Sequence, residues 1–227
     1  MRFLPAVLLL AVAAPSLAAE RNFSVTDYDR IRLDAPVRVT VTTGRGPSAR
    51  ATGDQAGIDR LKVEVQGRTL VIGRNVSSWG ATKPAGPVEV RLTAHDLSTA
   101  TVNGSGTLAI DRMRGGKLDL VVAGSGAIEV GTVEADRLTV GVVGDGRATV
   151  AGTAERADLV LRGTGSLVAE ALAADDLKLT ADGAGSVKAA ALKTANVASS
   201  GSGTITVAGG PACTVRATGS AEVRCGN

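Results

Sequence analysis

The carboxylates are the residues of this chain that could carry out catalysis. An enzyme that cleaves acidic polysaccharides needs paired carboxylates, usually with Lys, Arg or His beside them, because a general acid and a base or nucleophile must flank the scissile bond. The candidates are Asp119, Glu129, Asp145 and Asp182. They fall at different positions of the repeat described below, so the sequence predicts no paired site. A polysaccharide-active enzyme is therefore the least favoured of three functional readings.

The evidence for a catalytic histidine or a catalytic serine is equally weak in this sequence. The only histidine, His95, stands next to Asp96 in a short polar segment that is typical of a surface turn. Serines are numerous, but no nucleophile motif accompanies them. We therefore predict that the chain is not an enzyme, has no catalytic residues and needs no cofactor.

Two cysteines, Cys213 and Cys225, lie close to the C-terminus. An even number of cysteines in an exported protein favours a disulfide, and both positions are expected to face inward in the last repeat. Two free thiols or a metal-binding pair are the alternatives. No histidine or further cysteine lies nearby, so we predict a disulfide and no metal.

A Gly-x-Gly motif recurs along the second half of the chain. Successive copies are separated by 20, 20, 19, 20 and 18 residues, and a degenerate copy, Gly219-Ser220-Ala221, follows after 18 more. The glycine pairs are Gly104 and Gly106, Gly124 and Gly126, Gly144 and Gly146, Gly163 and Gly165, Gly183 and Gly185, and Gly201 and Gly203. A fixed period of this size predicts a solenoid. Since strands flank the glycines, sharp corners are favoured over a phosphate-binding loop, which needs a following helix.

Apolar residues alternate with polar ones on both sides of each corner, which is the pattern of a strand with one buried face. Leu118, Leu120 and Val122 precede one corner, and Ile128 and Val130 follow it. A third inward column is predicted nine residues after the first glycine, at Met113, Val133, Leu172 and Leu192. We therefore predict an all-β, right-handed parallel β-helix with roughly triangular coils of about 18–20 residues.

The chain divides into three parts. Residues 1–18 combine a basic residue, a short apolar run and small residues, which predicts a signal peptide cut after Ala18, or almost equally well after Ala19. Residues 19–96 alternate less regularly and predict broader starting coils or a cap, with no convincing helix. Residues 97–227 form the repeats. No later apolar run is long enough for a membrane-spanning helix.

Charge and composition exclude several partners. Removal of the leader takes away one arginine and no acid, which leaves 24 basic and 22 acidic residues and a net charge of +2. The basic residues are scattered, so neither nucleic acid nor an anionic membrane surface is predicted as a partner. The sequence contains one Trp, one Tyr and two Phe, too few to fill a wide core.

Two features could contact a ligand. The middle residues of the corners form a predicted ladder that could hydrogen-bond a glycan or a partner strand, although corners also favour small polar residues simply because they are solvated. The ladder contains Ser105, Ser125, Asp145, Thr164, Ala184 and Ser202. Trp79, in the long polar loop between residues 75 and 87, is either an exposed contact residue or packs on the first coil.

The order of these segments resembles the GIN-domain family, which is described as the head domains of autotransporter adhesins. The resemblance rests on Tyr28-Asp29-Arg30-Ile31, the strands near residues 37–41, 61–65, 69–72 and 87–90, and the series of Gly-Ser-Gly copies from Gly104. It covers nearly the whole chain after the leader. It implies a bacterial β-helix of the periplasm or cell surface, and it brings no catalytic residues with it. Nothing after Asn227 could form the membrane barrel of a true autotransporter, so surface attachment is expected to be non-covalent or indirect.

The favoured function is therefore a non-catalytic, exported binding or adhesion module of the bacterial cell envelope. Its partner is an unidentified protein or glycan of that envelope. The main alternative is a structural β-rod that self-associates or supports an envelope partner. Self-association would make it a homo-oligomer whose length depends on concentration.

Overall fold

The computed structural model describes residues 19–75 and 86–226 of the chain. The predicted signal peptide and Trp79 lie outside these described residues. In the N-terminal region, residues 19–75 and 86–94 contain seven strands and one short helix. These elements are β1 (Ala19–Phe23), β2 (Arg30–Leu33), β3 (Arg38–Thr43), β4 (Ser48–Gly53), α1 (Gln55–Asp59), β5 (Leu61–Gln66), β6 (Thr69–Arg74) and β7 (Val88–Ala94).

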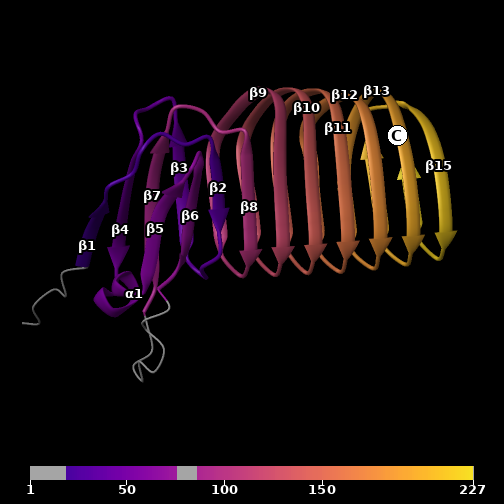
Figure 1. Cartoon of the computed structure of the whole chain (residues 1–227). Coiled ribbons are helices and arrows are strands. Elements are labelled where there is room, and N and C mark those ends of the chain that lie inside the picture. Colours follow the sequence, from indigo (N-terminus) through magenta and orange to yellow (C-terminus); the bar gives the residue numbers. More distant parts are fainter. Residues whose placement is uncertain (1–18, 76–85, 227) are drawn as a thin grey trace, which may run out of the picture.

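The repeats form a parallel β-helix, as predicted. Each long strand wraps around most of one coil and pairs in parallel with the strands of the coils before and after it. The strands are β8 (Thr99–Gly104), β9 (Thr107–Gly124), β10 (Ala127–Gly144), β11 (Arg147–Gly163), β12 (Ser166–Gly183), β13 (Ser186–Gly201), β14 (Thr204–Ala208), β15 (Ala212–Gly219) and β16 (Glu222–Cys225). In Figure 1 the near strands run downward while the coils advance to the right, so the winding is right-handed.

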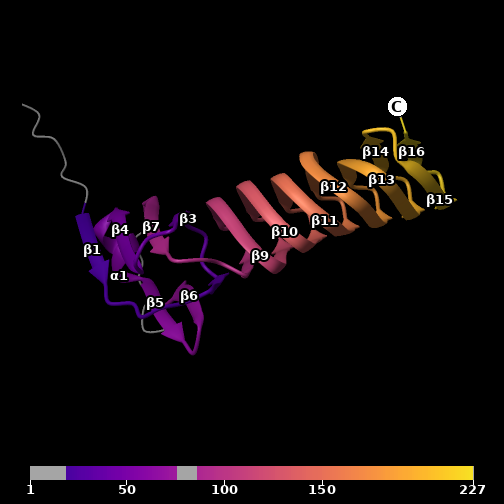
Figure 2. The ribbon, with the colours of Figure 1, turned by 90° about the horizontal axis from the view of Figure 1, so that it is seen from above.

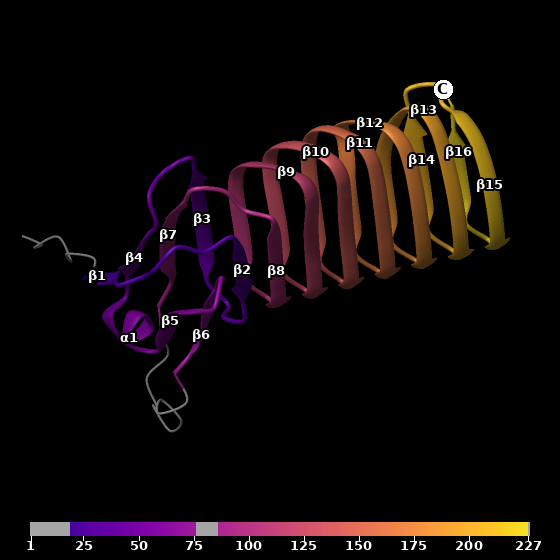
Figure 3. The ribbon, with the colours of Figure 1, turned by 45° about the horizontal axis from the view of Figure 1, so that its top comes forward.

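Each coil has two nearly straight faces (Figure 3). We call them the front sheet, formed by β8, the C-terminal halves of β9–β13 and β15, and the back sheet, formed by the N-terminal halves of β9–β13 with β14 and β16. The glycine corners join the two sheets at one edge, and a curved arch closes the coil at the opposite edge (Figure 1). The third predicted column lies in this arch, where Met113, Val133 and Leu172 are at most 1% exposed.

One member of that column was predicted wrongly. Leu192 is 55% exposed, and Ala191 is the buried residue of its coil. The cause is a change of register between β12 and β13, in which Ala191 pairs with Ala174 of the coil before. This coil is two residues shorter than the coil before it, so counting nine residues from the glycine lands on the outward position.

The corner glycines have the geometry that the sequence predicted. The first glycine of each corner adopts a positive φ, for example +120° at Gly163. Its Cα also lies directly on the corner below, because a Cβ added there would come within 2.5 Å of the Gly144 carbonyl oxygen. Backbone conformation and close stacking therefore both require glycine at this position.

The core between the two sheets is narrow and aliphatic. Inward residues of successive coils stack on one another, as Leu120, Val140, Leu159 and Leu179 do, each at most 1% exposed. Small side chains suffice because the two sheets are held close by the corners. The scarcity of aromatic residues in the sequence follows from this shape.

The N-terminal region extends both sheets beyond the first glycine corner. The back sheet continues through β3, β7, β4 and β1, and the front sheet continues through β2, β6 and β5. The strands do not stack in sequence order, since β2 and β3 lie between β6 and β7 on one side and β8 and β9 on the other. The chain therefore returns past β2 and β3 before it enters the repeats (Figure 2).

A short helix, α1, is present in a segment whose sequence shows no convincing helical pattern. Asp54 caps it by accepting a hydrogen bond from the Gly57 amide at 2.9 Å. The helix buries Ile58 at the N-terminal end of the core between the two sheets. One turn is too short to show a helical period, so only the capping residue could have indicated it.

Tyr28 anchors the junction between the cap and the repeats. The side chain is 1% exposed, and its hydroxyl donates a hydrogen bond to the Thr93 carbonyl at 2.8 Å. Burial raises the pKa of the phenol well above its ordinary value, and the negative charge of Asp27 raises it further. The ring therefore stays neutral and holds β7 against the segment that leads into β2.

The C-terminal coil is closed by the predicted disulfide between Cys213 of β15 and Cys225 of β16, whose Cα atoms are 6.3 Å apart. The two positions face inward in register, but Cys213 is exposed because no further coil covers it among the described residues. The bond joins the last strand of the front sheet to the last strand of the back sheet.

Loss of this disulfide is expected to loosen the last coil and leave the middle coils intact. Closing a loop of this size contributes about 3 kcal/mol in the chain-entropy model. In a Cys213→Ser/Cys225→Ser double variant, amide hydrogen exchange should accelerate in β15 and β16, while β10 and β11 exchange as in the parent. Unchanged exchange in β15 and β16 would show that stacking alone holds the coil.

Candidate functional site

The predicted corner ladder is present on the glycine edge of the molecule. Successive corners stack through backbone hydrogen bonds, such as the one from the Ser125 amide to the Gly104 carbonyl at 3.0 Å. The middle residues are exposed side by side along this edge: Ser105, Ser125, Asp145, Thr164, Ala184 and Ser202. Asp145 accepts a hydrogen bond from the Thr164 hydroxyl. Part of the ladder's hydrogen-bonding capacity is therefore used between neighbouring corners.

The four candidate carboxylates are not brought together. Asp119 and Asp182 lie on the front sheet several coils apart, Glu129 lies on the back sheet, and Asp145 lies on the corner edge. Asp119 pairs with Lys117 at 3.3 Å, and Asp182 accepts a hydrogen bond from Ser200 at 2.6 Å. These are solvated surface pairs with no shared cleft.

His95 lies where the sequence placed it, in the exposed connection after β7, and its carbonyl accepts a hydrogen bond from the Gly44 amide at 2.9 Å. Trp79 lies outside the described residues. Neither residue adds a described side chain to a binding surface.

The arch carries a different kind of polar surface, made of ion pairs between coils. Arg114 pairs with Glu134 at 2.9 Å, and Lys193 pairs with Asp175 at 2.8 Å. The hydrogen bond to Asp175 raises the pKa of Lys193. These exposed pairs link neighbouring coils, and each contributes little to stability.

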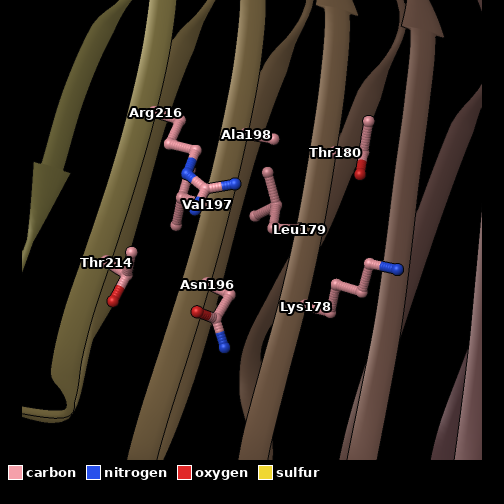
Figure 4. A pocket seen from close by; sticks show the side chains of 8 residues that line it. All are labelled: Lys178, Leu179, Thr180, Asn196, Val197, Ala198, Thr214 and Arg216. Carbon is pink, nitrogen blue, oxygen red and sulfur yellow. The ribbon is translucent and has the colours of Figure 1, made fainter.

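A shallow hollow of about 200 Å³ lies on the outer surface of the front sheet, over β12, β13 and β15 (Figure 4). It arises because Ala198 has a small side chain between two longer ones. Thr180 and Arg216 are its partners in the strands on either side. Its floor is the Ala198 methyl group and the backbone of Leu179 and Val197, since the side chains of both residues point into the core.

Polar groups surround this floor. Lys178, Asn196 and Thr214 occupy one row across the three strands, and Thr180 and Arg216 stand in the next row. In Figure 4 the Arg216 guanidinium lies over Val197 and Ala198, whereas the Lys178 ammonium points away from the hollow. Two strand spacings of about 4.8 Å separate the outer strands, which gives the hollow the width of one small ring.

Arg216 is the charged group that dominates this surface. Within residues 19–75 and 86–226 it makes no salt bridge or side-chain hydrogen bond, so its guanidinium donors remain available. A planar guanidinium binds carboxylates through two parallel hydrogen bonds. A flat floor with the small Ala198 side chain, bordered by amide and hydroxyl groups, suits the face of a sugar ring. The arrangement can therefore hold a small acidic ring compound.

The hollow could not be predicted from the sequence. Its members are outward residues of three strands that are separated in the sequence by 18 residues per coil. The available signal was the small Ala198 in a row of larger outward residues. That signal becomes visible only when the register of the coils is known.

Within the described ranges, no helix is both long and apolar enough to cross a bilayer.

The part of the fold from β2 to β14 matches a known family model. Residues 27–211 match the model described as "Putative auto-transporter adhesin, head GIN domain". The chain belongs to the GIN-domain family. This confirms the resemblance drawn from the glycine copies and the strands that precede them. The family description names adhesion and no enzymatic activity.

Solved structures share the GIN-domain fold along nearly their full length. A "putative adhesin" of Bacteroides fragilis is 19% identical with a TM-score of 0.77, covering 92% of this chain and 96% of its own. A "putative adhesin" of Parabacteroides distasonis is 23% identical with a TM-score of 0.71, covering 93% and 98%. A "putative lipid binding protein" of the same species is 21% identical with a TM-score of 0.73, covering 94% and 98%. Among curated protein sequences, none matches this chain.

Proposed function

We propose that this GIN-domain chain is a non-catalytic binding module exported to the bacterial cell envelope. Export is supported by the leader-like pattern of residues 1–18 and by the disulfide in the last coil, since disulfides persist in oxidising compartments. The adhesive character is supported by the family to which the chain belongs.

The ligand that the surface fits best is an acidic sugar unit of an envelope or host glycan. The observation that carries this proposal is Arg216, which makes no salt bridge within the described residues, beside the open space over Ala198 that Asn196, Thr180 and Thr214 border. Sugar rings bind through their apolar C–H face together with hydrogen bonds from amide and hydroxyl groups. The guanidinium then selects a carboxylate-bearing ring over a neutral one.

The test is binding of the purified protein to an array of neutral and uronate-containing oligosaccharides. Arg216→Ala is expected to reduce binding to the uronate glycans by roughly tenfold or more, since a charge-assisted hydrogen bond contributes about 1.5–3 kcal/mol. Asn196→Ala should weaken binding of neutral and acidic rings alike.

A matched control is Arg137→Ala, because Arg137 is also exposed on the front sheet but lies on β10, outside the hollow. It should leave binding unchanged. Equal loss in Arg137→Ala and Arg216→Ala would mean that general positive charge, not the hollow, attracts the glycan. Loss of binding in Trp79→Ala alone would move the site to the loop at residues 75–87.

A structural β-rod is the second candidate function. It is supported by the regular stacking of the coils and by the uncovered last coil, which can accept another chain. Recovery of one envelope protein without glycan binding would favour this reading.

A further inference from the structure

Within residues 86–226, the last coil at the C-terminal end of the β-helix has no further coil stacked on it. Among the described residues, β15 pairs only with β13, and β16 pairs only with β14. Val215 faces inward in register with Val197, yet it is 43% exposed, whereas Val197, one coil earlier, is 2% exposed. The last coil therefore presents apolar side chains and free strand edges, both of which favour association with another chain.

The hydrogen bonds to the preceding coil show which residues of these strands direct their backbone groups to the free edge. The amides of Glu222 and Gly226 donate to Gly203 and Val207 of the preceding coil, at 3.0 and 3.1 Å. Since alternate residues of a strand direct their N–H and C=O groups to opposite sides, Val223 directs both groups to the free edge.

The same alternation of backbone direction is found in β15. Thr214 stands in register with Asp119, whose amide donates to Ser98 of the preceding strand at 2.9 Å. Thr214 therefore directs its own N–H and C=O to the preceding strand. The next residue, Val215, directs its N–H and C=O to the free edge. Both edges thus offer unpaired backbone groups at an inward-facing valine.

The disulfide places these two valines at the same level. Cys213 and Cys225 face each other across the end of the core, with Cα atoms 6.3 Å apart. Val215 and Val223 each lie two residues nearer to the glycine corner along their strands. One straight line perpendicular to both sheets therefore passes close to both residues.

We propose that two copies of this chain pair tail to tail across this end, related by a two-fold axis along that line. The two-fold rotation reverses the strand direction, so β15 and β16 each pair antiparallel with their own counterpart. Val215 and Val223 then exchange both backbone hydrogen bonds with the same residues of the second copy. These are the residues whose backbone groups point to the free edges.

The side chains are complementary in the same register. Centring β16 on Val223 places Glu222 opposite Arg224 of the second copy, twice by symmetry. Opposite charges on directly facing residues favour an antiparallel pair. The inward side chains of the two last coils become the continuous core of one longer rod.

A second copy fits this end better than the cap of a following molecule does. The N-terminal end carries α1 and the β5–β6 hairpin beside its edge strands (Figure 2). Head-to-tail stacking would have to accommodate these elements, and it would build open-ended filaments. The tail-to-tail pair closes after two copies and leaves both caps at the outside.

Sedimentation velocity over a wide concentration range tests this proposal. The purified protein is expected to shift from monomer to dimer with rising concentration and to form no larger species. Val215→Glu should abolish the dimer, because it places two carboxylates next to each other at the axis. Val143→Glu is the matched control, since Val143 is 48% exposed on the front sheet away from this end, and it should dimerise like the parent.

A charge swap separates loss of pairing from loss of folding. Arg224→Glu should weaken the dimer by tenfold or more in dissociation constant, because Glu222 then faces another carboxylate. The double variant Glu222→Arg/Arg224→Glu restores the opposite pairing and should restore the dimer, with circular dichroism unchanged throughout. The proposal is overturned by a protein that stays monomeric, by a dimer that survives Val215→Glu, or by filaments.

Discussion

Gly163→Ala is expected to be among the most destabilising substitutions of one small residue for another in this protein. Gly163 has a φ of +120°, which costs an alanine about 1–2 kcal/mol. The added Cβ would also lie 2.5 Å from the Gly144 carbonyl oxygen, and this contact is to backbone that cannot rotate away. Together the two effects predict a loss of about 3 kcal/mol or more in the free energy of unfolding.

Two other glycines separate the contributions to this loss. Gly104 also has a positive φ, +96°, but a Cβ there meets nothing within 4 Å, so Gly104→Ala should cost only the conformational part. Gly141 has neither constraint, and Gly141→Ala should be neutral or stabilise by up to about 1 kcal/mol. Urea unfolding followed by far-UV circular dichroism measures all three. Equal losses at Gly163 and Gly104 would show that close stacking of the corners contributes nothing.

Truncation of an inward leucine in the middle of the stack should have an effect of similar size. Leu179 is fully buried between the corresponding residues of the coils before and after it. Leu179→Ala removes apolar contacts and leaves a cavity that the rigid hydrogen-bonded coils cannot close. The expected loss is about 2–5 kcal/mol in the free energy of unfolding.

Leu192→Ala is the matched control for this prediction. The same change of side chain at Leu192, which is 55% exposed in the arch, should alter stability by less than about 0.5 kcal/mol. The pair can be compared in one urea series with the same probe. A large loss at Leu192 would mean that this residue is covered in solution, and a small loss at Leu179 would mean that the coils collapse around the missing side chain.

The sequence was sufficient to predict the repeats because each coil repeats the same constraints. Positive φ at the corner selects glycine, and two inward faces select alternating aliphatic residues. Both signals recur about every twenty residues, so one ambiguous copy is corrected by its neighbours. The disulfide could be predicted for the same reason, since the columns of earlier coils placed Cys213 and Cys225 on the inside.

Prediction failed where repetition stops. The order of β2, β3, β6 and β7 depends on a chain that returns past its own earlier strands, and no local pattern records such a return. Leu192 was misplaced because its coil changes register by local adjustment in the arch. The hollow around Arg216 arises from outward side chains, whose identity varies freely between coils because no core constrains them.

The absence of aromatic residues from the repeats determines which optical probes can follow this protein. Tyr28, Phe23 and Trp79 all precede the first glycine corner, and the same is true of Phe3. Intrinsic fluorescence therefore originates from the N-terminal third of the chain alone, whereas the Cys213–Cys225 disulfide adds a near-ultraviolet dichroism signal from the last coil. Fraying of the last coils would be invisible to fluorescence, and a melting curve recorded by fluorescence would report when the cap detaches, not when the rod unwinds.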